Sequence, residues 1–192
     1  MDFEKLSAER YSLRKFDTRP VEQEKLNLIL EAGRNAPTAH NNQPQRIFVL
    51  QSQEALEKAD ACMDCHFHAP VVIGVGYDPK ESWHREHDGK DHGEIDAAIA
   101  VTQMMLQAAD LGLGTTYVGM FRPVDLVKTF PEMESGDDRH AASGVSRGGR
   151  PSRQAPRTAQ AHGGTGEVPV TPKKTPRLSR KPRCSFLRWR EI

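Results

Sequence analysis

The chain has 192 residues, with 27 Lys and Arg against 26 Asp and Glu, for a formal net charge of +1. Its three cysteines are too few for a disulfide scaffold, and no run of 18 apolar residues is present, which excludes a disulfide-rich domain and a membrane span. The first residues contain no apolar signal core, so we expect a cytoplasmic protein without a membrane partner.

The small net charge hides two segments of opposite sign. Residues 136–192 hold 13 Lys and Arg against 4 Asp and Glu, a net of +9, whereas residues 1–135 hold 14 against 22, a net of −8. Two segments this different are not expected to share one fold. We therefore predict a folded domain over residues 1–134 and a basic tail over 135–192. The tail is rich in Gly, Pro, Ser and Arg without periodicity, which is typical of disorder.

Helices and strands are mixed along the first segment. Leu26, Ile29 and Leu30 have helical spacing, and Gly33 and Pro37 are stop signals for that helix. Further helices are predicted at 53–63, 94–111 and 122–133, and strands at 45–51, 69–78 and 115–121. The strand at 69–78 is almost continuously apolar, as a buried central strand is. The helix at 94–111 is apolar on nearly every side, so it belongs in the protein interior or at a subunit interface. The pattern predicts an α+β fold, with a central mixed or antiparallel sheet flanked by helices.

Two polar stretches are candidates for ligand binding. Arg10, Ser12 and Arg14 alternate, so in an extended segment they point the same way and suit a phosphate; surface charge is the alternative. The loop "APTAHNNQPQ" offers amide donors and acceptors beside a strand, where ligands often bind. A plain turn closed by Asn and Pro, without a binding role, explains the same residues equally well.

Glycines 112 and 114 end the long helix in "DLGLGTTYVG" and permit close backbone approach. They do not form G-x-G-x-x-G after a strand, so no dinucleotide fingerprint is present.

These motifs, in this order, resemble the nitroreductase family of FMN-dependent NAD(P)H oxidoreductases. The resemblance covers about residues 8–134 and includes "APVVI" and "DAAIAVTQMMLQAADLGLGTTYVG". It implies a homodimer with FMN at the subunit interface and the helix at 94–111 in the dimer core. It also implies three groups of cofactor-binding residues. These are Arg10, Ser12 and Arg14 at the phosphate and pyrimidine side; Pro37, Thr38, Ala39, Asn41 and Gln43 in a loop from the partner subunit; and Tyr117, Val118 and Gly119 near the flavin ring.

The implied reaction is a hydride transfer from NADH or NADPH to FMN, followed by reduction of a nitroaromatic, a quinone or a similar small-molecule acceptor. The hard chemistry belongs to the cofactor, so we expect no catalytic acid or base from the protein. We also expect no metal site. The Cys62-x-x-Cys65 pair lacks a second pair at zinc spacing, and His84, His87 and His92 are expected in a solvated loop beside the substrate entrance.

The tail departs from the resemblance, which implies a further strand, a Gly-Tyr-Pro turn, a basic segment and a final helix after "FPEME". Read one base later, the codons of Asp137 to Arg150 can encode that strand and turn, and Val170 with Thr171 can yield a stop codon. We therefore interpret residues 135–192 as an out-of-frame segment. The alternative function is a non-catalytic dimerising remnant that binds flavin weakly and touches nucleic acid through a basic arm.

Overall fold

The computed structural model describes residues 2–133 and 144–149. Four strands form one sheet in the order β1-β2-β4-β3, and every neighbouring pair is antiparallel. The strands are β1 (Gln45–Leu50), β2 (Val71–Tyr77), β3 (Gly114–Val118) and β4 (Gly144–Gly149). The central position of β2 agrees with its apolar sequence, because both of its faces are covered and all seven residues are buried.

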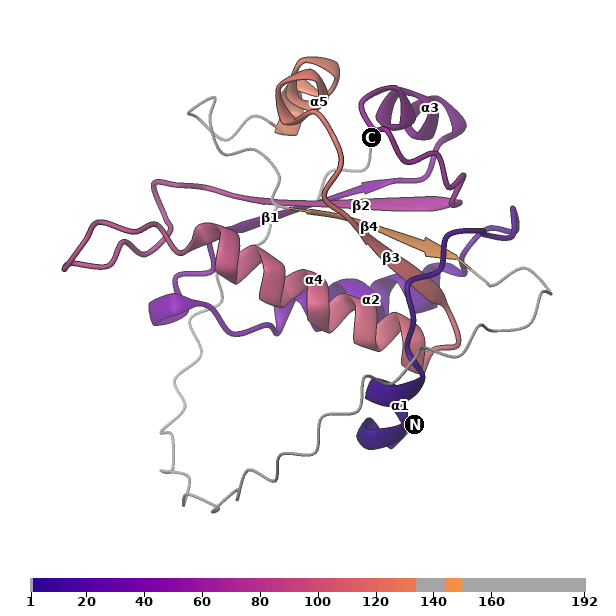
Figure 1. The fold of residues 1–192 in the computed structure, drawn as a ribbon, viewed down its shortest axis with the longest axis horizontal. Helices are drawn as coiled ribbons and strands as arrows, with labels where there is room; N and C mark the ends of the chain where they lie inside the picture. The colour runs from indigo at the N-terminus through magenta and orange to yellow at the C-terminus, as the bar shows by residue number, and fades with distance from the viewer. Residues whose placement is uncertain (1, 134–143, 150–192) are drawn as a thin grey trace, which may run out of the picture. The chain divides into compact units, whose positions relative to one another are not determined.

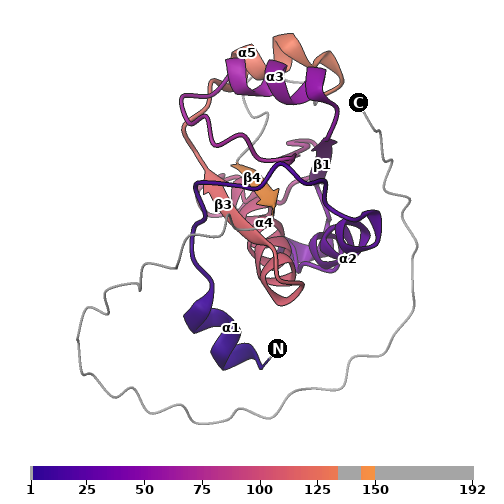
Figure 2. The same ribbon diagram turned by 90° about the vertical axis from the view of Figure 1, so that its right-hand side faces the viewer.

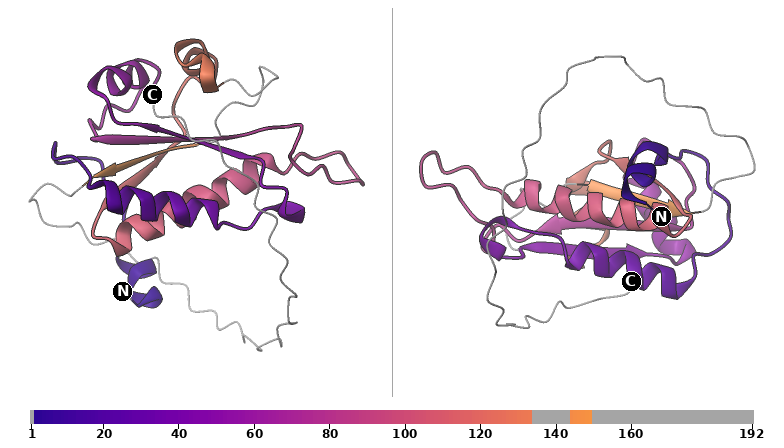
Figure 3. Two further views of the ribbon diagram at one scale, coloured as in Figure 1. Left: turned by 180° about the vertical axis from the view of Figure 1, so that it is seen from behind. Right: turned by 90° about the horizontal axis from the view of Figure 1, so that it is seen from below.

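Helices cover both faces of this sheet. Helices α2 (Gln23–Arg34) and α4 (Gly93–Asp110) lie side by side on one face, and α3 (Gln53–Ala61) and α5 (Pro123–Thr129) lie on the other (Figures 1 and 2). Views from behind and below show the same three layers (Figure 3). The short helix α1 (Phe3–Glu9) and two 3₁₀ turns, Ala39–Asn41 and Pro131–Met133, complete the described elements.

Alternate residues of β2 supply two separate cores. Val71, Ile73 and Val75 pack with apolar residues of α2 and α4, and Val72 packs with those of α3 and α5. This alternation follows from the two-residue period of a strand. Each face of the sheet therefore has its own layer of helices.

The α+β prediction is confirmed, and each predicted helix and strand is present within a few residues of its expected bounds. Helix α1 was not predicted. Its only buried residue is Leu6, so the segment lacks the apolar stripe that marks an amphipathic helix. Among the described residues, no helix has both the length and the apolar character needed to cross a membrane.

The strand β4 lies within the segment 135–192 for which the sequence predicts a basic tail. It lies between β2 and β3 and pairs with both through its backbone, with Val145 opposite Gly74 and Val118. Its sequence "GVSRGG" contains three glycines and is a poor strand former, so its composition carries no strand signal. The two flanking strands offer unpaired backbone groups, which any extended segment can satisfy. The rest of the predicted tail, residues 135–143 and 150–192, lies outside the described residues.

Replacing Val145 by Pro tests the central position of β4. Proline removes a backbone N–H and leaves a facing carbonyl without a donor, at a cost of about 1–3 kcal/mol. We expect a V145P variant to unfold at lower urea concentration than V145A, which keeps the N–H. Equal urea midpoints for the two variants would show that β4 does not pair inside the sheet in solution.

Candidate functional site

The segment after α1 runs beside β3. Ser12 forms a parallel bridge with Thr115, and the Leu13 N–H donates to the Thr115 carbonyl at 2.9 Å. The approach is close enough to require a glycine, because a Cβ on Gly114 would lie 2.4 Å from Cδ2 of Leu13. The segment is therefore paired with β3 at Ser12, between the two arginines of the predicted motif.

The two arginines of this segment differ in their surroundings. Arg10 is partly buried, and its Nη1 has neither solvent contact nor a hydrogen-bond partner among the described residues. Arg14 is exposed and donates from Nη1 to the Ser12 carbonyl at 3.3 Å. A buried guanidinium nitrogen without an acceptor is costly, whereas an anion such as a phosphate would satisfy it. The residues present therefore fit a phosphate-bearing ligand.

An open groove of about 750 Å³ lies between the outer face of α4 and the end of β3. Tyr117 and Gly119 line it, together with Glu94, Ile95 and Ile99. Burial, and secondly the Glu94 carboxylate, raise the pKa of Tyr117. A groove of this volume can accept a ligand the size of a nucleotide cofactor.

Val118 behaves differently from its two neighbours. Its side chain is buried and packs in the core with residues of α3 and α5, so only its backbone can contact a ligand. Strand alternation sends the Tyr117 side chain to the opposite face, where it is 40% exposed.

The loop between α2 and β1 has a strained backbone. His40, Asn41 and Gln43 have φ values of 52°, 56° and 54°, in the left-handed region that disfavours side chains. Among the hydrogen bonds that hold the loop, Ala39 N–H donates to Oδ1 of Asp96 at 2.9 Å, and Gln43 N–H donates to Oγ1 of Thr38 at 3.0 Å. Strained backbone that is held by its surroundings is typical of functional sites.

Residues 78–92 form an arm between β2 and α4, which we call the 78–92 arm; it projects beyond the sheet in Figure 1. The Arg85 N–H donates to the Lys90 carbonyl at 3.0 Å, and the His92 N–H donates to the Trp83 carbonyl at 3.0 Å. The predicted solvated loop is thus a paired arm whose base contacts the 37–43 loop.

Asp91 ties the base of the 78–92 arm to the sheet. Its Oδ1 accepts from the Gly93 N–H at 2.8 Å, and its Oδ2 accepts from the Tyr77 hydroxyl at 3.1 Å. Burial acts to raise the pKa of Asp91, but hydrogen bonds from Gly93, Ser82 and Tyr77 outweigh it and lower that pKa. Burial, with the Asp91 carboxylate second, raises the pKa of Tyr77.

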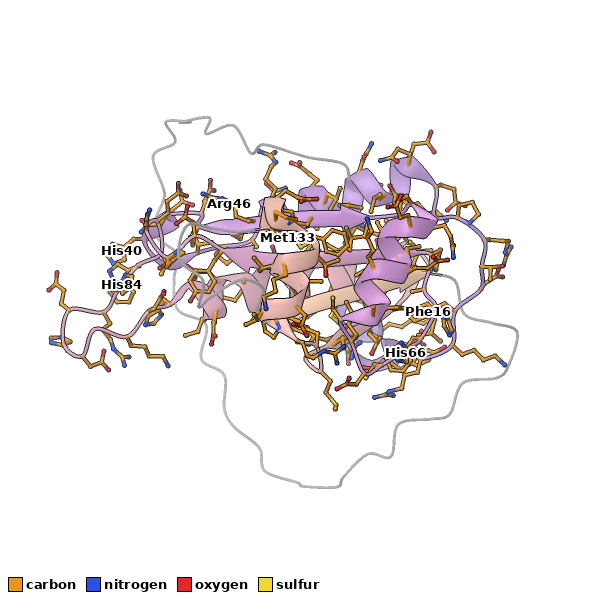
Figure 4. The ribbon with its side chains drawn as sticks, turned by 90° about the horizontal axis from the view of Figure 1, so that it is seen from above. Phe16, His40, Arg46, His66, His84 and Met133 are labelled. Carbon is orange, nitrogen blue, oxygen red and sulfur yellow. The ribbon has the colours of Figure 1, made fainter. Side chains whose placement is uncertain are left out.

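The arginine motif and the 37–43 loop lie near opposite ends of α4. Ala39 contacts Asp96 in the first turns of the helix, whereas Ser12 pairs with Thr115, beyond its last residue. A helix of 18 residues is about 27 Å long. Figure 4 shows His40 and His84 at one end of the sheet, and Phe16 and His66 at the other. One chain therefore does not bring the predicted groups into a single cleft.

The cysteines and histidines noted in the sequence do not form a metal cluster. Cys62 is buried at the end of α3, where its Sγ lies 3.4 Å from the Lys58 carbonyl, and Cys65 is partly buried; both are free thiols. Across residues 2–133 and 144–149, no three His, Cys, Asp or Glu side chains come together as metal ligands would.

Two residues of this region were missed in the sequence. Asp96 is only 2% exposed although it is charged, and Trp83 stacks on His40 at the base of the arm. Asp96 could have been found in the sequence, because it is a single acidic residue inside the otherwise apolar run "IDAAIAV". Trp83 could not, because its role depends on a contact between loops that are distant in the sequence.

The chain matches the Nitroreductase family over residues 8–66 and 58–145. It is 35% identical to a nitroreductase family protein of Clostridium difficile 630, whose crystal structure superposes with a TM-score of 0.76 over 82% of this chain and 89% of that one. An FMN reductase [NAD(P)H] of Bacillus subtilis is 30% identical over 61% of this chain, which spans only 54% of the Bacillus protein. An FMN-dependent nitroreductase of Clostridium difficile R20291, at 21% identity, shares the fold with a TM-score of 0.69 over 82% of this chain and 92% of that one.

Replacing Tyr77 by Phe tests the hydrogen bond at the base of the arm. Because folding raises the pKa of Tyr77, its hydroxyl contributes stability that is complete below its unfolded pKa, about 10. That contribution is lost as the pH rises through the higher folded value. We expect thermal unfolding of wild type and Y77F to differ most below pH 10 and to converge above it. A difference that stays constant through this range would contradict the assignment.

Proposed function

Because this chain belongs to the nitroreductase family, we propose that it is an FMN-dependent oxidoreductase that passes hydride from NADH or NADPH to a small organic acceptor such as a nitroaromatic or a quinone. The relatives named as FMN-dependent or FMN-reducing enzymes support the cofactor, and the family supports the class of reaction. When bound, FMN would supply the hydride chemistry, and the protein would bind and orient it.

The observation that carries this proposal is the unpartnered Nη1 of Arg10. It is buried beside a backbone segment whose position is set by pairing with β3. A phosphate there would accept from Arg10, with Arg14 and the Ser12 hydroxyl on the same segment. The pairing with β3 would hold these donors in register with Tyr117, whose side chain lines the groove.

The groove supplies a second part of the site. Tyr117 and Gly119 form one wall, and apart from Gly119 and its two chain neighbours no heavy atom of the described residues lies within 4 Å of where a Gly119 Cβ would be. A planar ring could therefore approach the backbone at Gly119 without steric hindrance. The main-chain N–H groups that follow β3 would be available to polar atoms of the ring edge.

We further propose that the enzyme is a cytoplasmic homodimer. The outer face of α4 carries Ile95, 41% exposed, and partly buried Ala98 and Ile99 along the open groove, and such an apolar face favours a partner. A second copy related by a two-fold axis can bring the 37–43 loop of one chain to the arginine motif of the other. This arrangement would unite Pro37, Thr38, Ala39, Asn41 and Gln43 with Arg10, Ser12 and Arg14 around one cofactor.

We also propose that residues 135–192 are read out of frame. Residues 1–134 would then be the part of the chain that resembles the family. The family match runs to residue 145, within the region where composition and charge change. The six residues of β4 contribute backbone pairing, which does not depend on the reading frame as strongly as side-chain packing does. This break also favours a second candidate function: a dimerising remnant with weak flavin binding and a basic arm for nucleic acid.

Replacing Arg10 by Ala tests the proposed phosphate contact. Loss of a charge-assisted hydrogen bond costs about 1.5–3 kcal/mol, so the FMN dissociation constant should rise roughly tenfold to a hundredfold. The measurement is quenching of flavin fluorescence on titration of the purified chain into FMN. R34A is the matched control, because Arg34 pairs with Glu31 at the end of α2. An R10A variant that binds FMN as tightly as R34A would contradict the contact.

The same preparation separates the two candidate functions. The enzyme should show a flavin absorption band that NADH or NADPH bleaches without oxygen and that a quinone restores. A colourless chain that excess FMN cannot reconstitute, and that binds DNA with strong salt dependence, would support the remnant instead.

Sequencing the coding DNA across codons 130–175 tests the reading-frame proposal. We expect one base to be gained or lost near codon 135 relative to a frame that encodes a Gly-Tyr-Pro turn and a stop near codon 170. A DNA sequence in which the present frame is intact, and the shifted frame encodes no such turn, would overturn the proposal.

A further inference from the structure

We propose that Asp96 and Trp83 are positioning residues. They hold the strained 37–43 loop in the conformation that contacts the cofactor. The inference rests on the proposed function, because it gives the loop the role of contacting FMN. Neither residue belongs to the three predicted cofactor-binding groups, and neither needs to touch the cofactor. Each contacts the loop from a different element, α4 or the 78–92 arm.

Asp96 fixes the backbone where the loop begins. It is 2% exposed in the first turns of α4, and its Oδ1 accepts from the Ala39 N–H at 2.9 Å across 57 residues of sequence. Its Oδ2 is also buried and has no hydrogen-bond partner among the described residues. A buried carboxylate is costly, so a hydrogen bond from the loop backbone offsets part of that cost only in this loop conformation.

Trp83 fixes the loop at its middle. Its ring stacks on His40, with centroids 4.9 Å apart and an interplanar angle of 20°, and it also meets the His92 ring edge-on, with centroids 4.7 Å apart. Beside this stack, Nδ2 of Asn42 donates to the Glu81 carbonyl at 3.0 Å. The 78–92 arm therefore contacts the loop at two positions, His40 and Asn42.

The backbone of the loop explains why such contacts are needed. Three non-glycine residues have φ between 52° and 56°, a left-handed conformation that persists only where the surrounding structure holds it. Without external contacts the loop would relax to other conformations, and only a fraction of molecules would present the competent one. The apparent dissociation constant rises as that fraction falls.

The experiment compares two pairs of variants in the full chain. D96N keeps an oxygen that can accept from Ala39 N–H, whereas D96A removes it. W83F keeps an aromatic ring for stacking on His40, whereas W83L does not. D88N is the matched control, because Asp88 is an exposed carboxylate of the same arm that pairs with Arg85. The readouts are the FMN dissociation constant, kcat at saturating FMN, and hydrogen exchange of the 38–43 amides without FMN.

We expect D96A and W83L to raise the FMN dissociation constant about tenfold. This is the rise that follows if the fraction of molecules with the competent loop conformation falls to about one tenth. D96N, W83F and D88N should stay within about threefold of wild type. Saturating FMN should restore kcat in both disruptive variants, because it selects the competent loop. Faster exchange at 38–43 should accompany the weaker binding.

Several outcomes would overturn the inference. Wild-type FMN affinity in both D96A and W83L would do so, as would exchange at 38–43 that is unchanged in both. If D96A does not fold, the W83L variant alone tests the inference. Trp83 is partly exposed on the arm, so its replacement is not expected to unfold the protein. If wild type itself binds no FMN, the proposed function fails, and hydrogen exchange still decides whether these residues hold the loop.

Discussion

The structure depends on the complete burial of β2. Its seven residues are covered by helices on both faces and paired with β1 and β4 at both edges. In such a strand every backbone N–H and C=O must find a protein partner, because water cannot reach them. The need for a strand on each side explains why a glycine-rich segment as unpromising as Gly144–Gly149 occupies the centre of the sheet.

Helix α4 connects the core to the candidate site. Its inner face packs against α2 and the sheet through Ala97, Val101 and Met104, so its position is set by the core. Its first turns place Asp96 against the 37–43 loop, and its outer face forms a wall of the groove that Tyr117 also lines. The arginine motif and the 37–43 loop lie near opposite ends of this helix, which is about 27 Å long, and this separation is consistent with the proposed site completed by a second copy of the chain.

Polar atoms without internal partners mark where a ligand is expected. Arg10 Nη1 is a buried donor without an acceptor among the described residues, and the phosphate of the proposed cofactor would supply one. The 37–43 loop has a second local cost, the left-handed backbone of His40, Asn41 and Gln43. Contacts with neighbouring elements hold these residues in a conformation that they do not prefer by themselves. Both features lie on elements whose backbone is anchored elsewhere, as a preorganised binding site requires.

The sequence by itself determined the α+β class, the family and most of the elements, but not α1 or β4. Periodicity identified α2, β2 and α4, because burial of a face leaves a repeating apolar pattern in the chain. The motif at Arg10, Ser12 and Arg14 could likewise be read as a ligand-binding segment from residue types and spacing. The tertiary structure alone decided that Val118 faces the core, that Trp83 stacks on His40, and that β4 pairs between β2 and β3. The physical reason is that these features depend on contacts between segments distant in sequence, or on backbone pairing, and neither leaves a local signal in the chain.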